Sequence, residues 1–87
     1  MLFRSYSYKY EDLEFDSEKD ALYVLEELEA IIRERDFATV LDMYQYVDGI
    51  RPDPVDDEWG WTSLRTAEIR PTRTGYILLM PRPKPLR

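Results

Sequence analysis

The carboxylates of one short acidic segment are the first residues in this chain whose types and spacing could do chemistry. Asp53, Asp56, Asp57 and Glu58 fall within six residues, and hard cations such as Ca²⁺ and Mg²⁺ bind oxygen ligands of this kind. The segment lacks the spacing of an EF-hand loop, which has a central Gly and a bidentate Glu at its end. We therefore interpret it as a solvated acidic loop, and we expect no metal and no cofactor.

Groups that could act as catalysts are scarce. The 87 residues include no His and no Cys, so Ser and Thr hydroxyls lack the usual activating base and there is no thiol nucleophile. The three Gly are isolated and form no phosphate-binding loop. Catalysis by paired carboxylates needs a cleft of about 300 Å³ or more, for which so short a chain has little volume. We expect a protein that is not an enzyme.

The composition is that of one small globular domain, with 44% hydrophobic and 34% charged residues. The absence of Cys favours a reducing compartment, because small secreted domains usually depend on disulfides. No apolar run approaches the roughly 18 residues of a membrane span, and the N-terminus lacks the apolar stretch of a signal peptide. We therefore expect a soluble cytoplasmic domain that does not bind membranes.

Charge is divided unevenly along the chain. Residues 1–61 carry six Lys and Arg against seventeen Asp and Glu, a net charge of −11, whereas residues 62–87 carry six Lys and Arg against one Glu, a net charge of +5. The basic region could pair with the acidic region of the same chain, bind that of a second copy, or bind nucleic acid. We rank the interpretations in that order, because a nucleic-acid binder normally presents a clearly positive face and this chain has a net charge of −6.

Six residues are candidates for partner binding. Trp is enriched in interface hot spots, and two Trp flank a single Gly. A chain this short can hardly leave both rings exposed, so we expect at least one of them to close the core. The other candidates are basic residues near the C-terminus. The full set is Trp59, Trp61, Arg70, Arg73, Arg82 and Lys84.

Hydrophobic periodicity predicts the elements of the N-terminal half. Alternating aromatic residues predict a strand over Phe3–Tyr10, and the acidic segment Glu11–Asp16 then interrupts the pattern. A 3.6-residue period begins after Ser17, which is the expected N-cap, and lasts about five turns. A short link then leads to a second helix, with Thr39 as its N-cap and Gly49 as its left-handed C-terminal residue. The two helices should pack as a pair.

The sequence of the C-terminal half predicts turns and one β-hairpin. We expect a loop over Ile50–Glu58, a sharp turn at Gly60 and one helical turn over Thr62–Arg65. The runs Ala67–Arg70 and Tyr76–Met80 predict a β-hairpin, because a five-residue segment ending in Gly separates them. That glycine, Gly75, is expected to adopt a positive φ. Residues 81–87 form a Pro-rich extended tail.

Together these elements predict an α+β fold with an N-terminal strand, a two-helix hairpin and a C-terminal β-hairpin, in one small domain spanning residues 1–87. The outline is compatible with a winged helix. However, the second helix carries Asp42 and Asp48 and no basic residue, so it would make a poor recognition helix. The predicted core consists of Val24, Leu25, Leu28, Ile32, Val40, Leu41, Tyr44, Trp61, Leu64, Ile69 and Leu78.

Two motifs in the C-terminal half, taken with the two predicted helices, are similar to those of a known protein family. They are the Gly60-Trp61 pair and the ending that runs from Gly75-Tyr76 to Leu79-x-Pro81-x-Pro83. Over residues 17–86 the chain resembles a family of small, largely uncharacterised bacteriophage and prophage proteins. It departs from that pattern at Asp36-Phe37, where an aromatic-Gly pair is expected. The resemblance supplies no catalytic residues, and it implies a role in phage assembly or host interference. The remaining matching residues are Ala21, Val24, Leu25, Leu28, Thr39, Val40, Asp42, Tyr44, Trp59, Leu64, Ala67, Ile69 and Leu86.

We therefore expect a phage-type accessory protein that acts through contact with a phage structural protein or a host protein, in the host cytoplasm or the virion. It could also form a homo-oligomer. One alternative is nucleic-acid binding through Arg70, Arg73, Arg82 and Lys84. Another is inhibition of a host nucleic-acid enzyme, in which the acidic first helix imitates phosphates.

Overall fold

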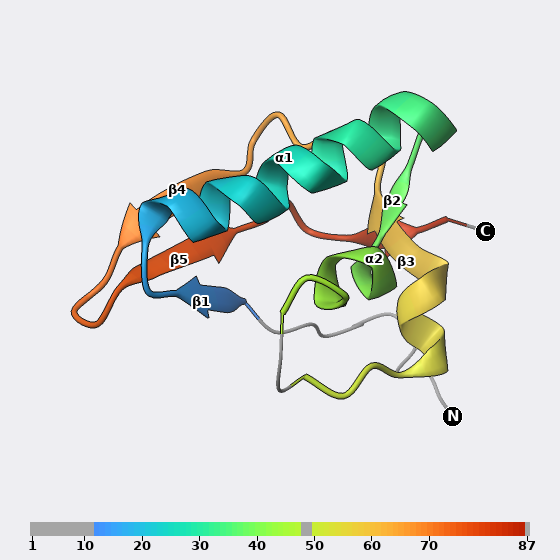
Figure 1. The fold of residues 1–87 in the computed structure, drawn as a ribbon. Coiled ribbons are helices and arrows are strands. Elements are labelled where there is room, and N and C mark those ends of the chain that lie inside the picture. The colour runs from blue at the N-terminus through green and yellow to red at the C-terminus, as the bar shows by residue number, and fades with distance from the viewer. Residues whose placement is uncertain (1–11, 48–49, 87) are drawn as a thin grey trace.

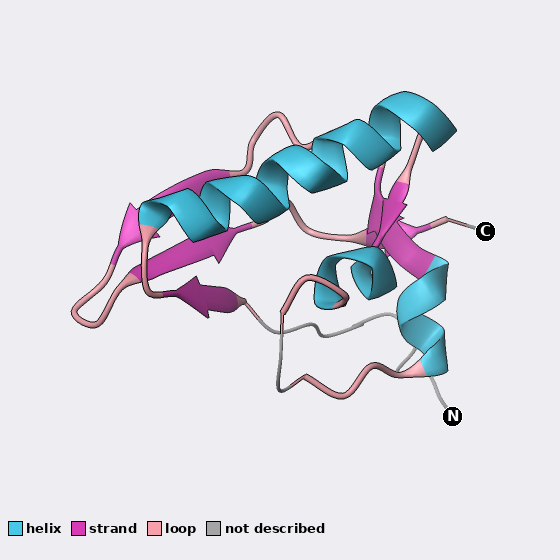
Figure 2. Ribbon diagram, in the orientation of Figure 1, coloured by secondary structure: helices cyan, strands magenta, loops and turns pink. Residues whose placement is uncertain are grey.

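A long helix lies across two small antiparallel sheets in this protein (Figures 1 and 2). The computed structural model describes residues 12–47 and 50–86. Within this part of the chain, each of the two sheets has three strands. The predicted α+β class is confirmed. The predicted strand Phe3–Tyr10 and the predicted helix end at Gly49 lie outside the described residues.

The long helix α1 (Glu18–Arg35) matches the prediction closely. The Ser17 side chain caps it by accepting a hydrogen bond from the Asp20 N–H at 3.2 Å. Acidic residues occupy its first turn and basic residues its last turn, which suits the helix dipole. The helix ends at Asp36, which adopts a left-handed conformation with φ 74° and donates its N–H to the Ile32 carbonyl.

The first sheet consists of β1 (Leu13–Phe15), β4 (Glu68–Pro71) and β5 (Tyr76–Leu79), in the order β1-β5-β4. The predicted hairpin is confirmed as β4 and β5. The prediction that residues 11–16 only interrupt a strand is wrong, because β1 lies there and pairs with β5. Leu13 is buried while Glu14 is exposed, an alternation too short to stand out in an acidic segment.

Gly75 serves this sheet in a way that the sequence does not indicate. Its φ lies outside the left-handed region, so the predicted positive φ is wrong. A Cβ at this position would instead overlap the backbone carbonyl of Phe15. The glycine is needed because β1 passes close to the end of the hairpin.

The second sheet consists of β2 (Ala38–Thr39), β3 (Trp59–Trp61) and β6 (Lys84–Pro85), in the order β2-β3-β6. Gly60 lies inside β3, so the predicted sharp turn is wrong. It pairs with Thr39 on one side and with Lys84 on the other. A Cβ at position 60 would overlap the Ala38 carbonyl oxygen and lie 2.7 Å from the Thr39 Cα. Gly60 therefore permits the close approach of β2 to β3.

We expect Gly60→Ala to lower the free energy of unfolding by about 1–3 kcal/mol, because backbone atoms must move apart to admit the methyl group. Urea unfolding followed by circular dichroism measures this change. Thr62→Ala is the matched control, since Thr62 is exposed directly after β3, and we expect it to change stability by less than about 0.5 kcal/mol. Equal stability of the Gly60→Ala variant and the unaltered protein would contradict the close approach.

Three short segments differ from the remaining expectations. The second helix, α2 (Val40–Tyr44), has five residues and is shorter than predicted, although its N-cap Thr39 is confirmed. The expected loop over Ile50–Glu58 ends in a 3₁₀ helix, η2 (Pro54–Glu58), where the Asp53 N–H donates to the Asp56 carboxylate at 2.8 Å. No helical turn forms over residues 62–65. There, the Ala67 N–H instead closes a turn by donating to the Leu64 carbonyl at 3.0 Å.

The core lies between α1 and the sheets, with α2 packed against α1, β2 and β3. Leu25, Ile32 and Ile69 are predicted core residues that lie partly buried against it, and Leu41 is partly buried. The prediction missed Leu13, Ala21, Ala38, Met43 and Met80. The predicted core residues that are buried are Val24, Leu28, Val40, Tyr44, Trp61, Leu64 and Leu78.

Candidate interaction surfaces

The two tryptophans of β3 contribute to the core. The Trp61 side chain is 2% exposed, and its indole N–H donates a hydrogen bond to the Pro81 carbonyl at 2.6 Å. Trp59 is partly buried against the same core. Trp61 therefore presents almost no surface to a partner, and it ties β3 to the segment that leads into β6.

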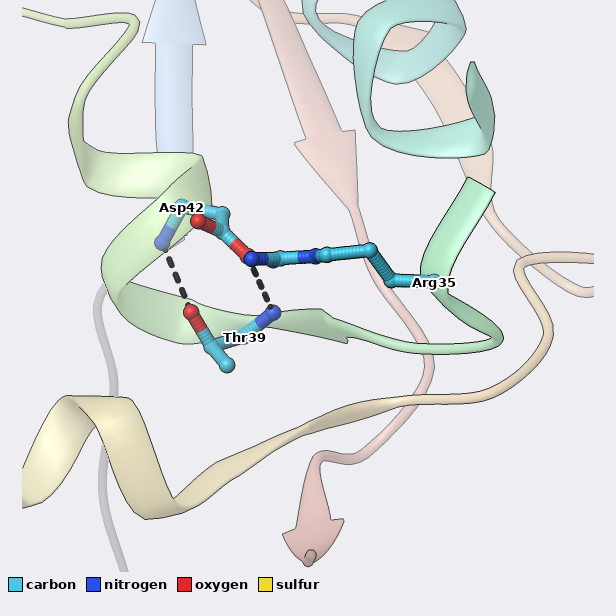
Figure 3. A network of polar contacts seen from close by, with 3 residues as sticks. All are labelled: Arg35, Thr39 and Asp42. Carbon is cyan, nitrogen blue, oxygen red and sulfur yellow. Dashed lines mark hydrogen bonds and ion pairs between the residues drawn. The ribbon is translucent and has the colours of Figure 1, made fainter. Parts of the chain in front are cut away.

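A polar network joins the end of α1 to the start of α2 (Figure 3). One Asp42 carboxylate oxygen accepts from the Thr39 N–H at 2.9 Å and from the Arg35 guanidinium at 2.6 Å. In return the Thr39 hydroxyl accepts from the Asp42 N–H at 2.9 Å. Because the Thr39 side chain is buried, this capping box gives it a partner in the core and fixes the start of α2.

We expect Asp42→Ala to lower the free energy of unfolding by about 0.5–2 kcal/mol, because it removes half of the capping box. Thermal unfolding followed by circular dichroism measures the loss. Arg35→Gln is the matched control, since Arg35 pairs with the same carboxylate from an exposed position, and we expect its effect to stay within about 1 kcal/mol. If both variants lost the same stability, the ion pair rather than the cap would hold the two helices together.

The four basic candidates lie at two separate places. Arg70 is in β4 and Arg73 is in the loop of the β4–β5 hairpin, whereas Lys84 begins β6 and Arg82 precedes it by two residues. All four are exposed. The four candidates therefore form two separate basic sites, one at the hairpin and one at the edge formed by β6.

The internal pairing that we ranked first is not found among the described residues. Residues 12–47 and 50–86 contain two ion pairs, Arg35–Asp42 and Arg70–Glu68. The first joins two residues of the acidic region, and the second joins two residues of the basic region. Within the described part of the chain, the charges of Arg73, Arg82 and Lys84 thus remain exposed and unpaired.

The outer edge of β6 is short of hydrogen-bond donors. The Leu86 N–H donates to the Glu58 carbonyl at 2.9 Å, so residue 86 directs its backbone groups toward β3. Since backbone groups alternate sides along a strand, residues 83 and 85 direct theirs away from β3. Both are Pro and have no N–H. The Pro-x-Pro spacing therefore blocks addition of another strand, and it leaves the side chains of Arg82 and Lys84 as the accessible features of this edge.

A groove of about 420 Å³ lies between β1, the first half of α1 and the segment after α2. The expectation that so short a chain has little volume for a cleft of about 300 Å³ is therefore wrong. Three exposed carboxylates and three aromatic rings form most of its wall. No Lys or Arg of the described residues forms an ion pair with these carboxylates. We call this site the acidic groove, and its lining residues are Glu14, Phe15, Asp16, Asp20, Tyr23, Val24, Tyr46 and Val47.

Two tyrosines form one side of the acidic groove. The rings of Tyr23 and Tyr46 meet edge to face, with centroids 6.1 Å apart. Desolvation by burial, and next the negative charge of Glu27, raise the pKa of Tyr46 above its ordinary value of 10.0. Tyr46 thus stays neutral at physiological pH, and Tyr23 is 56% exposed. The groove therefore offers open aromatic surface beside negative charge.

A second groove of about 400 Å³ lies at the other end of α1. Arg35 and Phe37 line it together with Thr39 and Leu86, and the Arg35 guanidinium lies 5.1 Å from the centre of the Phe37 ring. The Arg35 guanidinium already forms an ion pair with Asp42 and lies over the Phe37 ring. The second groove therefore has less unsatisfied charge than the acidic groove.

Metal-binding clusters and membrane-spanning helices are both absent from the described residues. Within residues 12–47 and 50–86, no three His, Cys, Asp or Glu side chains are grouped to hold a metal ion. Every buried side-chain nitrogen or oxygen in the same ranges has a hydrogen-bond partner. No helix of the described chain has both the length and the apolar character needed to cross a membrane.

The acidic groove could not be predicted from the sequence, because its lining comes from segments that are distant in the sequence. The one available signal was the group of aromatic and acidic residues between Glu14 and Tyr23. Comparison with known proteins adds no assignment: the chain matches no protein-family model, no curated protein and no solved structure.

Proposed function

We propose that this protein is a non-enzymatic accessory protein that acts through protein–protein contact and self-associates. The observation that carries the proposal is the separation of two exposed charged surfaces, the acidic groove and the basic edge at Arg82 and Lys84, which form no ion pairs within the described residues. Surfaces of this kind are complementary to an oppositely charged partner and guide its orientation. The resemblance to bacteriophage proteins supplies the proposed setting, in a virion or an infected cell.

The acidic groove suits a protein partner better than a small substrate. It is open, and its polar groups are carboxylates set beside exposed tyrosine surface. Aromatic faces and carboxylates both attract Lys and Arg side chains. The partner chemistry that this groove favours is therefore a protein segment carrying Lys or Arg.

Affinity capture from infected and uninfected cells tests the proposal. The tagged protein is compared with a Glu14→Lys/Asp16→Lys variant and with a Glu34→Lys control, because Glu34 is an exposed residue near the other end of α1. We expect the protein and the control to recover the same partner and the groove variant to lose it. Equal recovery by all three would exclude the groove, and turnover of a substrate by the purified protein would overturn the non-enzymatic role.

Nucleic-acid binding is a second candidate, supported by the exposed and unpaired Arg73 in the hairpin loop. The five residues of α2 include Asp42 and no basic residue, so this helix offers little to a DNA groove. Binding through the basic residues would weaken steeply with added salt, because it releases counterions. Changing Arg70, Arg73, Arg82 and Lys84 to Ala should abolish such binding, and unchanged affinity would exclude it.

Inhibition of a nucleic-acid enzyme by α1 is a third proposal, supported by the exposed Glu26 and Glu29. Lys19 and Arg33 are exposed on the same helix and interrupt its negative charge, which weakens the likeness to a row of phosphates. Reversing Glu26, Glu27 and Glu29 to Lys should abolish inhibition if α1 is the inhibitory surface. Inhibition that survives these changes would exclude this role.

A further inference from the structure

We propose that the acidic groove of one copy binds Arg82 and Lys84 of a second copy, so that copies join head to tail. This inference rests on the proposed function and names the partner of the groove. Its first support is chemical complementarity. The groove presents Glu14, Asp16 and Asp20 beside the ring of Tyr23, which together match a guanidinium or an ammonium group.

The second support is the geometry of the basic edge. Arg82 is followed by Pro83, which favours an extended conformation at residue 82, and side chains two residues apart in an extended chain point the same way. Arg82 and Lys84 are both exposed, and they would stand about 6–7 Å apart along the strand direction. Glu14 in β1 and Asp16 directly after it are likewise two residues apart, so the spacing of the two cations matches that of these two carboxylates.

The third support is that the basic edge does not reach the acidic groove of its own chain. The acidic groove lies at the β1 end of the molecule, whereas β6 lies beside β3 near the C-terminal end of α1 (Figure 1). Pairing with β3, together with the hydrogen bond from the Leu86 N–H to the Glu58 carbonyl, holds β6 in place. The basic edge is therefore presented away from the groove of its own chain and is available only to another copy.

The fourth support concerns the type of contact. Because Pro83 and Pro85 remove the outward donors of β6, the edge cannot extend a neighbouring sheet in the usual way. Its recognition has to run through side chains, which is what the carboxylates and rings of the groove offer. A contact between two different surfaces is heterologous, so each added copy leaves one free groove and one free edge. The net charge of −6 on each copy opposes this association, and we expect it to be weak.

Sedimentation velocity of the full-length protein over a wide concentration range tests the proposal. The groove variant is Glu14→Lys/Asp16→Lys, and the edge variant is Arg82→Glu/Lys84→Glu. All four positions are exposed, and circular dichroism verifies the fold of each variant. We expect the unaltered protein to form species that grow with concentration, and each variant alone to associate about tenfold or more weakly, as loss of a charge-pair contact implies.

Mixing the two variants gives the decisive result. The edge variant keeps an intact groove and the groove variant keeps an intact edge, so one native contact can form between them. The altered groove and the altered edge left at the two ends of this pair carry exchanged charges and can also bind, so the mixture should regain association that grows with concentration. Combining all four changes in one chain should restore association, since the charges are exchanged. Glu29→Lys/Glu34→Lys and Arg65→Glu/Arg73→Glu are the charge-matched controls, since they change the net charge by the same amounts at exposed positions outside the two surfaces. They should associate like the unaltered protein.

A monomer at all concentrations, or association that neither variant weakens, would overturn the head-to-tail contact. A mixture that remains monomeric would do the same. These outcomes would remove self-association but not the protein–protein contact of the proposed function, because capture of another protein that depends on the groove would still support that contact. In that outcome a basic segment of a different protein, and not a second copy, occupies the groove.

Discussion

Trp61→Ala is expected to lower the free energy of unfolding by about 3–5 kcal/mol, the usual range for removing a buried aromatic side chain. The Trp61 side chain is 2% exposed and belongs to the main core cluster. Its partner across the sheet is Ala38, whose small side chain cannot refill the space. The substitution also leaves the Pro81 carbonyl without the indole N–H that it accepts at 2.6 Å. Urea unfolding followed by circular dichroism measures the loss.

Trp59→Ala is the matched control, because it removes the same side chain from the same strand at a partly buried position. We expect a smaller loss of stability from this variant than from Trp61→Ala. The comparison separates a structural role from a binding role for the Trp-Gly-Trp segment. If Trp61→Ala kept its stability and lost a binding partner, Trp61 would be an interface residue and its place in the core would be wrong.

Elements whose signals lie within one segment could be predicted from the sequence. The helix α1 has an N-cap at Ser17, a hydrophobic period of 3.6 residues and basic residues in its last turn. The N-cap at Thr39 and the β4–β5 hairpin rest on equally local features, a capping residue in one case and a glycine-containing turn in the other. Such features act through hydrogen bonds and torsions between near neighbours, so they are readable without the tertiary structure.

Elements formed by distant segments could not be predicted in the same way. Strand β3 pairs with β2, which precedes it by about twenty residues, and with β6, which follows it by a similar distance. These strands contain two or three residues each, which is too few to show a period. Gly60 and Gly75 were read as turn residues because that is the local use of glycine. Their actual roles depend on backbones that reach them from elsewhere in the chain.

For the candidate binding residues too, some properties could be predicted from local sequence and others depend on the fold. Exposure of the basic residues followed from their charge and was expected, but their distribution over a hairpin and a sheet edge depends on the topology. The acidic groove brings Glu14 and Asp20 to Tyr46, so about thirty residues separate its two sides in sequence. Residue types indicated that charge would matter in this protein. The fold determines which charges lie together and which ones remain unpaired.

Leu28→Ala is expected to lower the free energy of unfolding by about 2–5 kcal/mol, because it removes a buried leucine side chain and leaves a cavity. Leu28 is 0% exposed and lies in the middle of α1, the helix that contacts strands of both sheets. The loss would be a large fraction of the roughly 5–15 kcal/mol that stabilises a typical domain. Chemical unfolding monitored by tryptophan fluorescence measures it, since Trp61 belongs to the same core cluster.

The matched control is Leu22→Ala, which makes the same chemical change on the same helix at a position that is 43% exposed. We expect this variant to lose much less stability, because a partly exposed leucine buries little apolar surface and leaves no cavity. The difference between the two variants therefore reports the orientation of α1 rather than its helix propensity, which the two substitutions change equally. A loss below about 1 kcal/mol for Leu28→Ala, or equal losses for the two variants, would contradict that orientation. The acidic groove would then be in doubt as well, because Val24 and Tyr23 line it from the same helix.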